Sequence, residues 1–155
     1  GLPGIKILEF AFGGGPDSEF LPHNWPRDCV AYTGSHDNDT IIGWFNDRGG
    51  PGTTRNAEQA DRERQTALEY LGSDGRELHW DFIRALLASV ADLTIVPMQD
   101  LLGLGTEARM NLPGCPAGNW EWRLHAGQAT HLIAERLGRM TRLYGRARGR
   151  GEHGG

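Results

Sequence analysis

Apolar and polar positions divide the chain into short strand-like runs separated by longer helical segments. Three runs rich in β-branched and aromatic residues predict strands at 5–10, 29–32 and 93–98. The last run is apolar almost throughout, which is typical of a strand buried on both faces of a parallel sheet. The pattern therefore predicts an α/β fold.

Helical periodicity occupies much of the remaining sequence and predicts four helices, at 40–47, 55–71, 77–91 and 127–144. The second is rich in arginine, glutamate and glutamine, which indicates a solvated surface, and Thr53 or Thr54 offers it an N-cap. The third carries a broad apolar stripe that predicts packing against the sheet, formed by Leu78, Trp80, Phe82, Ile83, Leu86, Leu87 and Val90.

The segment at 13–27, between the first two predicted strands, predicts a long loop. It contains three consecutive glycines and three prolines, a composition that does not hold a helix. Parallel neighbours usually need a helical crossover, so this connection is unusual. Phe20 and Trp25 within it either anchor the loop in the core or present a stacking face to a ligand.

A polar segment follows the second predicted strand directly. Residues Ser35, His36, Asp37, Asn38 and Asp39 are all polar and lead into the next helix. In folds with parallel strands, substrate sites gather at the carboxyl ends of the strands. Capping of the following helix accounts for Asn38 or Asp39. His36 and Asp37 are then left as candidate site residues.

A second polar pair, Gln99 and Asp100, comes just past the third predicted strand. Because carboxyl ends of parallel strands share one edge of the sheet, we expect this pair to lie level with His36 and Asp37. We expect Asp100 to cap the turn that follows it rather than to contact a ligand.

Composition excludes several classes of partner. The chain has 155 residues, 38% of them hydrophobic and 23% charged, with a formal net charge of −4, which gives no electrostatic reason to expect a nucleic acid or an anionic membrane. No apolar run approaches the roughly 20 residues of a membrane span. Cys29 and Cys115 are too few for a disulfide framework, which favours a reducing, cytoplasmic compartment. Residues 145–155 are of low complexity and predict a disordered tail after a domain of 1–144.

Other motifs predict neither a cofactor nor a metal site. The string G-x-G-x-x-A at 103–108 is separated from its strand and lacks the acidic residue at the end of a following strand that a dinucleotide site requires. The His36–Asp37 doublet is a possible start for a metal site, but the other histidines show no recognised ligand spacing.

Five segments in order along the chain resemble the C-terminal part of the 4-alpha-glucanotransferases (amylomaltases, or disproportionating enzymes, of glycoside hydrolase family 77). They are GLPGIKILEFAF at 1–12, LPHNWPR at 21–27, YTGSHDNDT at 32–40, IVPMQDLLGLG at 95–105, and RMNLPG through GNWEWR at 109–123. The resemblance implies a C-terminal fragment of a (β/α)8 barrel, comprising about its last three strands with their helices and loops. Glu9 stands where the family usually has glutamine, which leaves the role of that position open.

The resemblance also implies an activity. The family moves α-1,4-glucan segments between maltooligosaccharides or starch by a retaining double displacement, with a glucan donor and a sugar acceptor. Its nucleophile and its acid/base lie on earlier strands, outside these residues. Asp37 matches the third acid, which holds the 2- and 3-hydroxyls of the distorted sugar, with His36 beside it.

Asn38 and Trp120 are the further substrate-binding candidates, and Trp120 with Trp122 either forms a platform for sugar or has at least one ring buried in the core. The isolated fragment is expected to be inactive. The alternatives are a glucan-binding fragment without activity and, with less support, a metal-dependent hydrolase that uses the His36–Asp37 doublet; the oligomeric state is left open.

Overall fold

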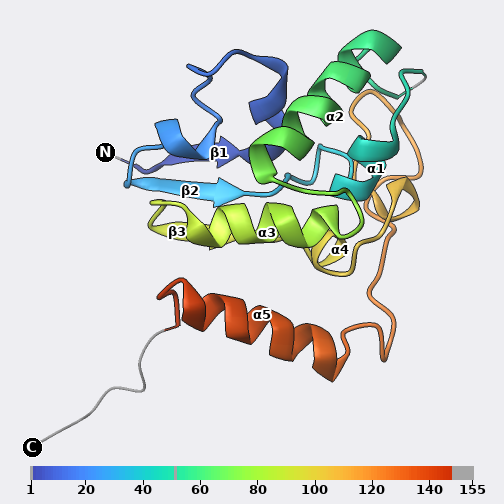
Figure 1. Ribbon diagram of the computed structural model, residues 1–155. Coiled ribbons are helices and arrows are strands. Elements are labelled where there is room, and N and C mark those ends of the chain that lie inside the picture. The colour runs from blue at the N-terminus through green and yellow to red at the C-terminus, as the bar shows by residue number, and fades with distance from the viewer. Residues whose placement is uncertain (1, 51, 148–155) are drawn as a thin grey trace, which may run out of the picture.

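Three parallel strands form the centre of the fold, as the sequence pattern predicts (Figure 1). The computed structural model describes residues 2–50 and 52–147. Strands β1 (Gly4–Ile7), β2 (Cys29–Tyr32) and β3 (Leu93–Ile95) lie in that order across the sheet. Gly4 pairs with Cys29 at the start of β1, and Tyr32 pairs with Ile95 at the end of β3, so the carboxyl ends of the strands share one edge.

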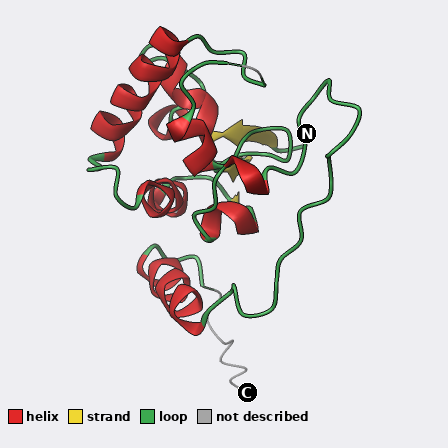
Figure 2. Ribbon diagram, turned by 90° about the vertical axis from the view of Figure 1, so that its right-hand side faces the viewer, coloured by secondary structure: helices red, strands yellow, loops and turns green. Residues whose placement is uncertain are grey.

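Helices and short 3-10 turns fill the connections. The helices are α1 (Ile41–Asn46), α2 (Ala57–Leu71), α3 (Leu78–Ala88), α4 (Met98–Leu101) and α5 (His131–Leu143), and the 3-10 turns are η1 (Leu8–Gly13), η2 (Pro22–Asn24) and η3 (Thr106–Ala108). The four predicted helices are thus present within a few residues of their expected bounds. Residues 109–130 run from the carboxyl edge of the sheet to α5 as a long loop without helix or strand (Figure 2).

The crossover from β1 to β2 uses 3-10 turns where an α-helix is usual. The first predicted strand ends at Ile7, and Leu8 onward coils into η1, which corrects the expected extent of 5–10. Phe12, Leu21 and Trp25 of this crossover are buried in the core. They provide the apolar cover that a crossover helix would otherwise supply. Trp25 is thus a core anchor, and Phe20 is half-buried against the same core.

One face of the sheet is covered by helices and holds the main core. Helix α3 contributes most of this cover, and Phe82 at its centre is fully buried. The Phe82 ring lies 5.6 Å from that of Phe12 and 5.7 Å from that of Trp44, so η1, α1 and α3 meet in one aromatic cluster. The predicted apolar stripe is confirmed except for Val90, which lies beyond the end of the helix and is exposed.

The third strand differs from its prediction. Leu93 is 52% and Ile95 is 38% exposed, so β3 is not buried on both faces. The physical reason is the face on which they lie, because Leu93 and Ile95 are two positions apart and point to the side of the sheet that no described helix covers. Ile5 on β1, the opposite edge of the sheet, is also exposed.

The cap of α2 is also different from the expected one. Asn56, and not Thr53 or Thr54, accepts a hydrogen bond from the Gln59 amide, and the Gln59 side chain accepts from the Asn56 amide. This reciprocal pair is a capping box. Its sequence signature is present at 56–59, but the adjacent threonines offer an equally simple N-cap.

Helix α5 lies beside α3, on the side away from α2 (Figure 1). Ile133, Leu137 and Met140 pack against Trp80 and its neighbours to form a second, smaller core. Within the predicted tail of 145–155, Arg146 donates hydrogen bonds to the carbonyls of three residues at and after the end of α3, namely Leu87, Ser89 and Ala91. Residues 148–155 lie outside the described residues.

Candidate active site

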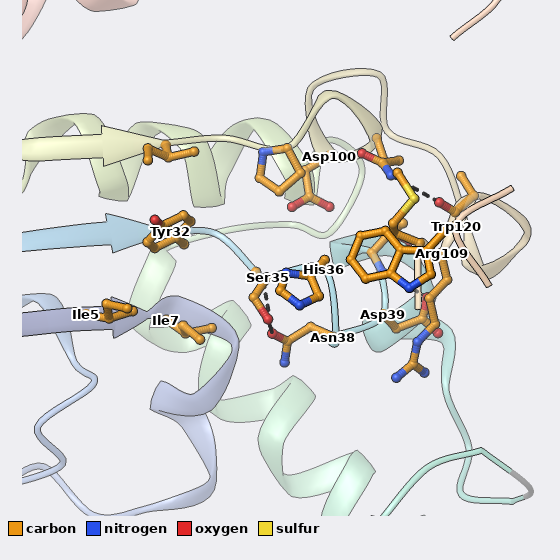
Figure 3. Close-up of a pocket in the computed structure, with 17 residues that line it drawn as sticks. Ile5, Ile7, Tyr32, Ser35, His36, Asn38, Asp39, Asp100, Arg109 and Trp120 are labelled. Atoms are coloured by element: carbon orange, nitrogen blue, oxygen red, sulfur yellow. Dashed lines mark hydrogen bonds between the residues drawn. The ribbon is translucent and has the colours of Figure 1, made fainter. Parts of the chain in front are cut away.

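A cavity of about 490 Å³ opens over the carboxyl edge of the sheet (Figure 3). Its lining has two parts. The apolar part comes from strand side chains on the face without helices, and it consists of Ile5, Ile7, Tyr32 and Ile95. The polar part comes from the loops beyond the strands, and its main members are Ser35, His36, Asn38, Asp39, Gln99, Asp100, Arg109 and Trp120. The two predicted polar segments therefore meet here, as expected from parallel strands.

Asp100 joins the loop after β2 to the start of α1. One carboxylate oxygen accepts from the Thr33 hydroxyl at 2.6 Å and the other from the Ile41 amide at 2.9 Å, and the residue is only 2% exposed. The expected role of Asp100 as a cap for its own following turn is therefore wrong. Burial raises the pKa of the Asp100 carboxyl, while these two hydrogen bonds oppose the rise.

Neither Asn38 nor Asp39 caps α1, contrary to the sequence expectation. The cap is Thr40, whose hydroxyl accepts from the Gly43 amide. Asn38 instead closes the polar loop, because its amide oxygen accepts from both the amide and the hydroxyl of Ser35. Asp39 accepts from the Thr106 hydroxyl at 2.8 Å and thereby ties this loop to η3.

His36 and Asp37 lie at the outer end of the polar part. Their side chains are 56% and 52% exposed, and His36 Nε2 is 3.4 Å from Asp37 Oδ1. His36 and Asn38 line the cavity, whereas Asp37 between them is not one of its lining residues. Asp37 Oδ1 accepts a hydrogen bond of 2.6 Å from Asn111 Nδ2.

Trp120 stands over the polar part of the cavity next to His36, and the two ring centroids are 5.1 Å apart (Figure 3). Its side chain is 53% exposed, and Trp122 is only half-buried. The alternative that at least one of the two rings lies in the core is therefore wrong. Trp120 has a φ of 63°, and no other non-glycine residue among those described has a positive φ. Such a conformation costs a bulky residue about 1–3 kcal/mol, and residues held in this way cluster at ligand sites.

Arg109 and Asn111 are site residues that the sequence reasoning did not single out. Arg109 Nη2 donates to the Asp37 carbonyl at 2.7 Å, and the Asn111 amide donates to the His36 carbonyl at 3.1 Å. They are more than 70 positions from their partners in sequence, so no local spacing could reveal the contact. The only signal was that both fall within one of the segments that resemble the family.

Glu9 is a buried carboxyl group that lies against Thr33 and Gly34, at the start of the loop after β2. It is 4% exposed, its amide donates to the Thr33 carbonyl, and a Cβ on Gly34 would lie 3.1 Å from its Oε1. No described residue forms a hydrogen bond with this oxygen. Burial, and then the nearby Asp100 and Asp39, hold the pKa of Glu9 well above its usual range, although Arg55 and Arg109 act in the opposite direction.

This raised pKa predicts that the fold loses stability as pH rises. A carboxyl with a raised pKa in the folded state contributes stability below its unfolded pKa, and that contribution is lost as pH rises through the folded pKa. We expect Glu9→Gln, which cannot ionise, to unfold at a higher temperature than the parent protein at pH 8 and to lose this advantage toward pH 4.5. Thermal unfolding across that pH range measures the difference. Glu69→Gln, on the exposed face of α2, should show no such trend. Equal pH dependence of the parent and Glu9→Gln would contradict the expectation.

The described part of the chain holds neither a metal site nor a membrane-spanning helix. Across 2–50 and 52–147, no group of three or more His, Cys, Asp or Glu side chains is arranged to hold a metal ion. Within the same residues, no helix has both the length and the apolar character needed to cross a membrane.

Parallel strands, helices on one face and a cavity lined by polar loops at the carboxyl edge define an α/β protein, and in folds of this class ligand sites gather at that edge. The model of the 4-alpha-glucanotransferase family matches residues 1–130. The 4-alpha-glucanotransferase of Clostridium butyricum is 44% identical over 147 residues, which are 94% of this chain and 28% of that protein. That of Thermus thermophilus is 43% identical over 148 residues, which are 90% of this chain and 27% of that protein.

A solved structure, amylomaltase from Streptococcus agalactiae in complex with acarbose, has the same arrangement. It matches with a TM-score of 0.80 and 35% sequence identity, over 95% of this chain and 28% of that one. The chain therefore belongs to the 4-alpha-glucanotransferase family. It spans only about 28% of the length of these relatives.

Proposed function

We propose that the chain is the C-terminal part of a 4-alpha-glucanotransferase and forms about the last three strands of its (β/α)8 barrel. The face of the sheet that lacks helices carries Ile5, Ile7, Tyr32 and Ile95, and in a barrel with outer helices such a face points inward. The outer edges of β1 and β3, which pair with no other described strand, then pair with strands from the rest of the barrel. Sugar binds to the polar part of the cavity, and the apolar part is covered by side chains of the other strands.

The reaction that fits this site is retaining transfer of α-1,4-glucan segments from a donor glucan to an acceptor sugar. Two carboxyl groups about 5–5.5 Å apart carry out such a double displacement, one as nucleophile and one as acid and then base. We assign both to residues outside this chain. Asp37 supplies the third carboxylate, which holds sugar hydroxyls that bind more strongly as the ring flattens toward the transition state.

The observation that carries this assignment is the environment of Asp37 within a chain of this family. The carboxylate is 52% exposed between the lining residues His36 and Asn38, one of its oxygens accepts a hydrogen bond from Asn111, and no described residue donates a hydrogen bond to the other. Charge-assisted hydrogen bonds to hydroxyls are shorter and stronger than neutral ones, so an ionised, held carboxylate suits this task.

His36, Asn38 and Trp120 complete the proposed substrate contacts. His36 lies beside Asp37 as a hydroxyl partner, and the Trp120 ring next to it offers an apolar face to the sugar. The side-chain oxygen of Asn38 already accepts hydrogen bonds from Ser35, so we assign the contact of Asn38 with substrate to its Nδ2. Cys29 and Cys115 are both free thiols, which favours a reducing compartment such as the cytoplasm.

Product analysis with maltotriose tests the proposal. We expect the complete enzyme that carries residues 1–155 to release glucose together with maltooligosaccharides longer than maltotriose, because transfer lengthens one chain for each one that it shortens. The isolated chain should release nothing, although it retains Asp37. Glucose release by the isolated chain would show that the nucleophile and the acid lie within these residues. Glucose and maltose without longer products would indicate hydrolysis and would contradict the assignment of a transferase.

A further inference from the structure

Two segments far apart in sequence form a closed set of hydrogen bonds around Asp37. Asn111 Nδ2 donates to the Asp37 carboxylate at 2.6 Å, and the Asn111 amide donates to the His36 carbonyl at 3.1 Å. Arg109 Nη2 donates to the Asp37 carbonyl at 2.7 Å, while its Nε donates to the Asn111 carbonyl at 2.9 Å. The guanidinium thus bridges the backbones of the two segments, and the Asn111 side chain fixes the carboxylate itself.

We propose that Asn111 is a positioning residue for Asp37, an inference that rests on the proposed function. Its Nδ2 fixes Oδ1 of the carboxylate, which sets the direction of Oδ2 toward the sugar hydroxyls. Without this bond, an aspartate side chain that is 52% exposed rotates among its rotamers, and little else restrains it. Displacement of a positioned group by about 1 Å costs up to about 100-fold in rate.

The contacts of Asn111 make this residue suitable for a clean test. Its other two hydrogen bonds use its backbone amide and carbonyl, which substitution preserves. Asn111→Ala therefore removes only the bond to the carboxylate. Because Asp37 acts on the distorted sugar in the transition state, we expect kcat of the complete enzyme to fall about tenfold while KM for maltotriose stays within about twofold.

A second variant gives a readout that a merely structural role would not produce. Asn111→Asp places two carboxyl groups within hydrogen-bonding distance, where one of them has a raised pKa and donates to the other once protonated. The turnover of Asn111→Asp relative to the parent enzyme should therefore rise as pH falls, whereas that of Asn111→Ala should stay level. The other charged neighbours of Asp37, His36 and Arg109, are the same in both variants.

Asn56→Ala serves as the matched control. It removes the side-chain cap of α2, and Asn56 is not one of the residues that line the cavity. It should lower the unfolding temperature without changing kcat. Melting temperatures of all variants show whether each is folded, and Asn111→Ser replaces Asn111→Ala if the latter does not fold.

The outcomes separate this inference from the proposed function. A tenfold loss of kcat in Asn111→Ala with the acid-shifted profile of Asn111→Asp supports it. An unchanged kcat, or a loss confined to KM, overturns it when Asp37→Asn is inactive, and the proposed function then stands. If Asp37→Asn turns over fully, the role proposed for Asp37 is wrong and the positioning role is overturned with it, whereas the products from maltotriose still decide the proposed transfer reaction.

Discussion

Replacing Asp37 with asparagine is expected to reduce turnover of the complete enzyme by at least about 1000-fold while glucan binding is largely retained. The change is nearly isosteric, and an asparagine oxygen can still accept the hydrogen bond that Asn111 donates to Asp37 Oδ1. The loop geometry should therefore persist, and the variant should lose mainly the negative charge. Contacts to the sugar that strengthen in the transition state contribute several kcal/mol, and each 1.4 kcal/mol is a factor of about ten in rate.

The measurement combines maltotriose turnover with a dissociation constant determined by calorimetry, for which the probe is acarbose, the ligand in the related Streptococcus agalactiae structure. Asp92→Asn provides the matched control, because Asp92 lies before β3 at the opposite edge of the sheet and pairs with Arg27 on the surface. That substitution should leave both quantities unchanged. Full activity of Asp37→Asn would remove the assigned role. A loss of acarbose binding as large as the loss of turnover would instead show that Asp37 binds the ground state and the transition state equally well.

Replacing Trp120 with glycine is expected to weaken acarbose binding by about 30-fold and, at the same time, to stabilise the fold. Aromatic rings at binding sites commonly contribute about 2 kcal/mol or more to the binding free energy. The Trp120 ring is exposed beside His36 and is therefore accessible to a ligand. The φ of 63° is one that glycine adopts without steric cost, so Trp120→Gly relieves backbone strain. Most substitutions that impair binding leave stability unchanged or lower it, which makes this combination diagnostic.

Calorimetry with acarbose and thermal unfolding measure the two effects. Trp122→Gly is the control, since Trp122 lies two positions away and has no positive φ. It should not gain stability, because glycine only adds backbone freedom there. A Trp120→Gly variant that binds acarbose as well as the parent enzyme would show that the ring serves only the fold.

The sequence pattern predicted the layers of the fold because they depend on local periodicity. β2 has the bounds that its apolar run indicated, and the stripe on α3 is buried as far as the helix extends. Failures occurred where burial depends on distant neighbours. The residues of β3 have the pattern of a strand covered on both faces, yet the exposure of Leu93 and Ile95 is decided by whether other parts of the protein cover the face of the sheet without helices.

The candidate site was predictable to a similar degree. Parallel strands bring polar residues after β2 and β3 to one edge, and this placed His36 and Asp100 together without any coordinates. Hydrogen-bond partners were not predictable, because capping rules consider only near neighbours in sequence. Asp100 caps nothing nearby, and instead accepts from residues 59 and 67 positions away. The hydrogen bond that Asn111 donates to Asp37 was not predictable for the same reason.

The buried Asp100 carboxylate has a consequence for engineering this fold. Thr33, Ile41 and Asp100 come from three separate segments and have to be transplanted as a unit, since a graft that carries two of them leaves a buried polar group without its partner. The residues at 112–119 are different. The Asn119 side chain accepts a hydrogen bond from the Leu112 amide and donates one to the Cys115 carbonyl, so this loop is held by its own residues. Most of these residues are exposed. Changes of length there would leave the contacts among Thr33, Ile41 and Asp100 intact.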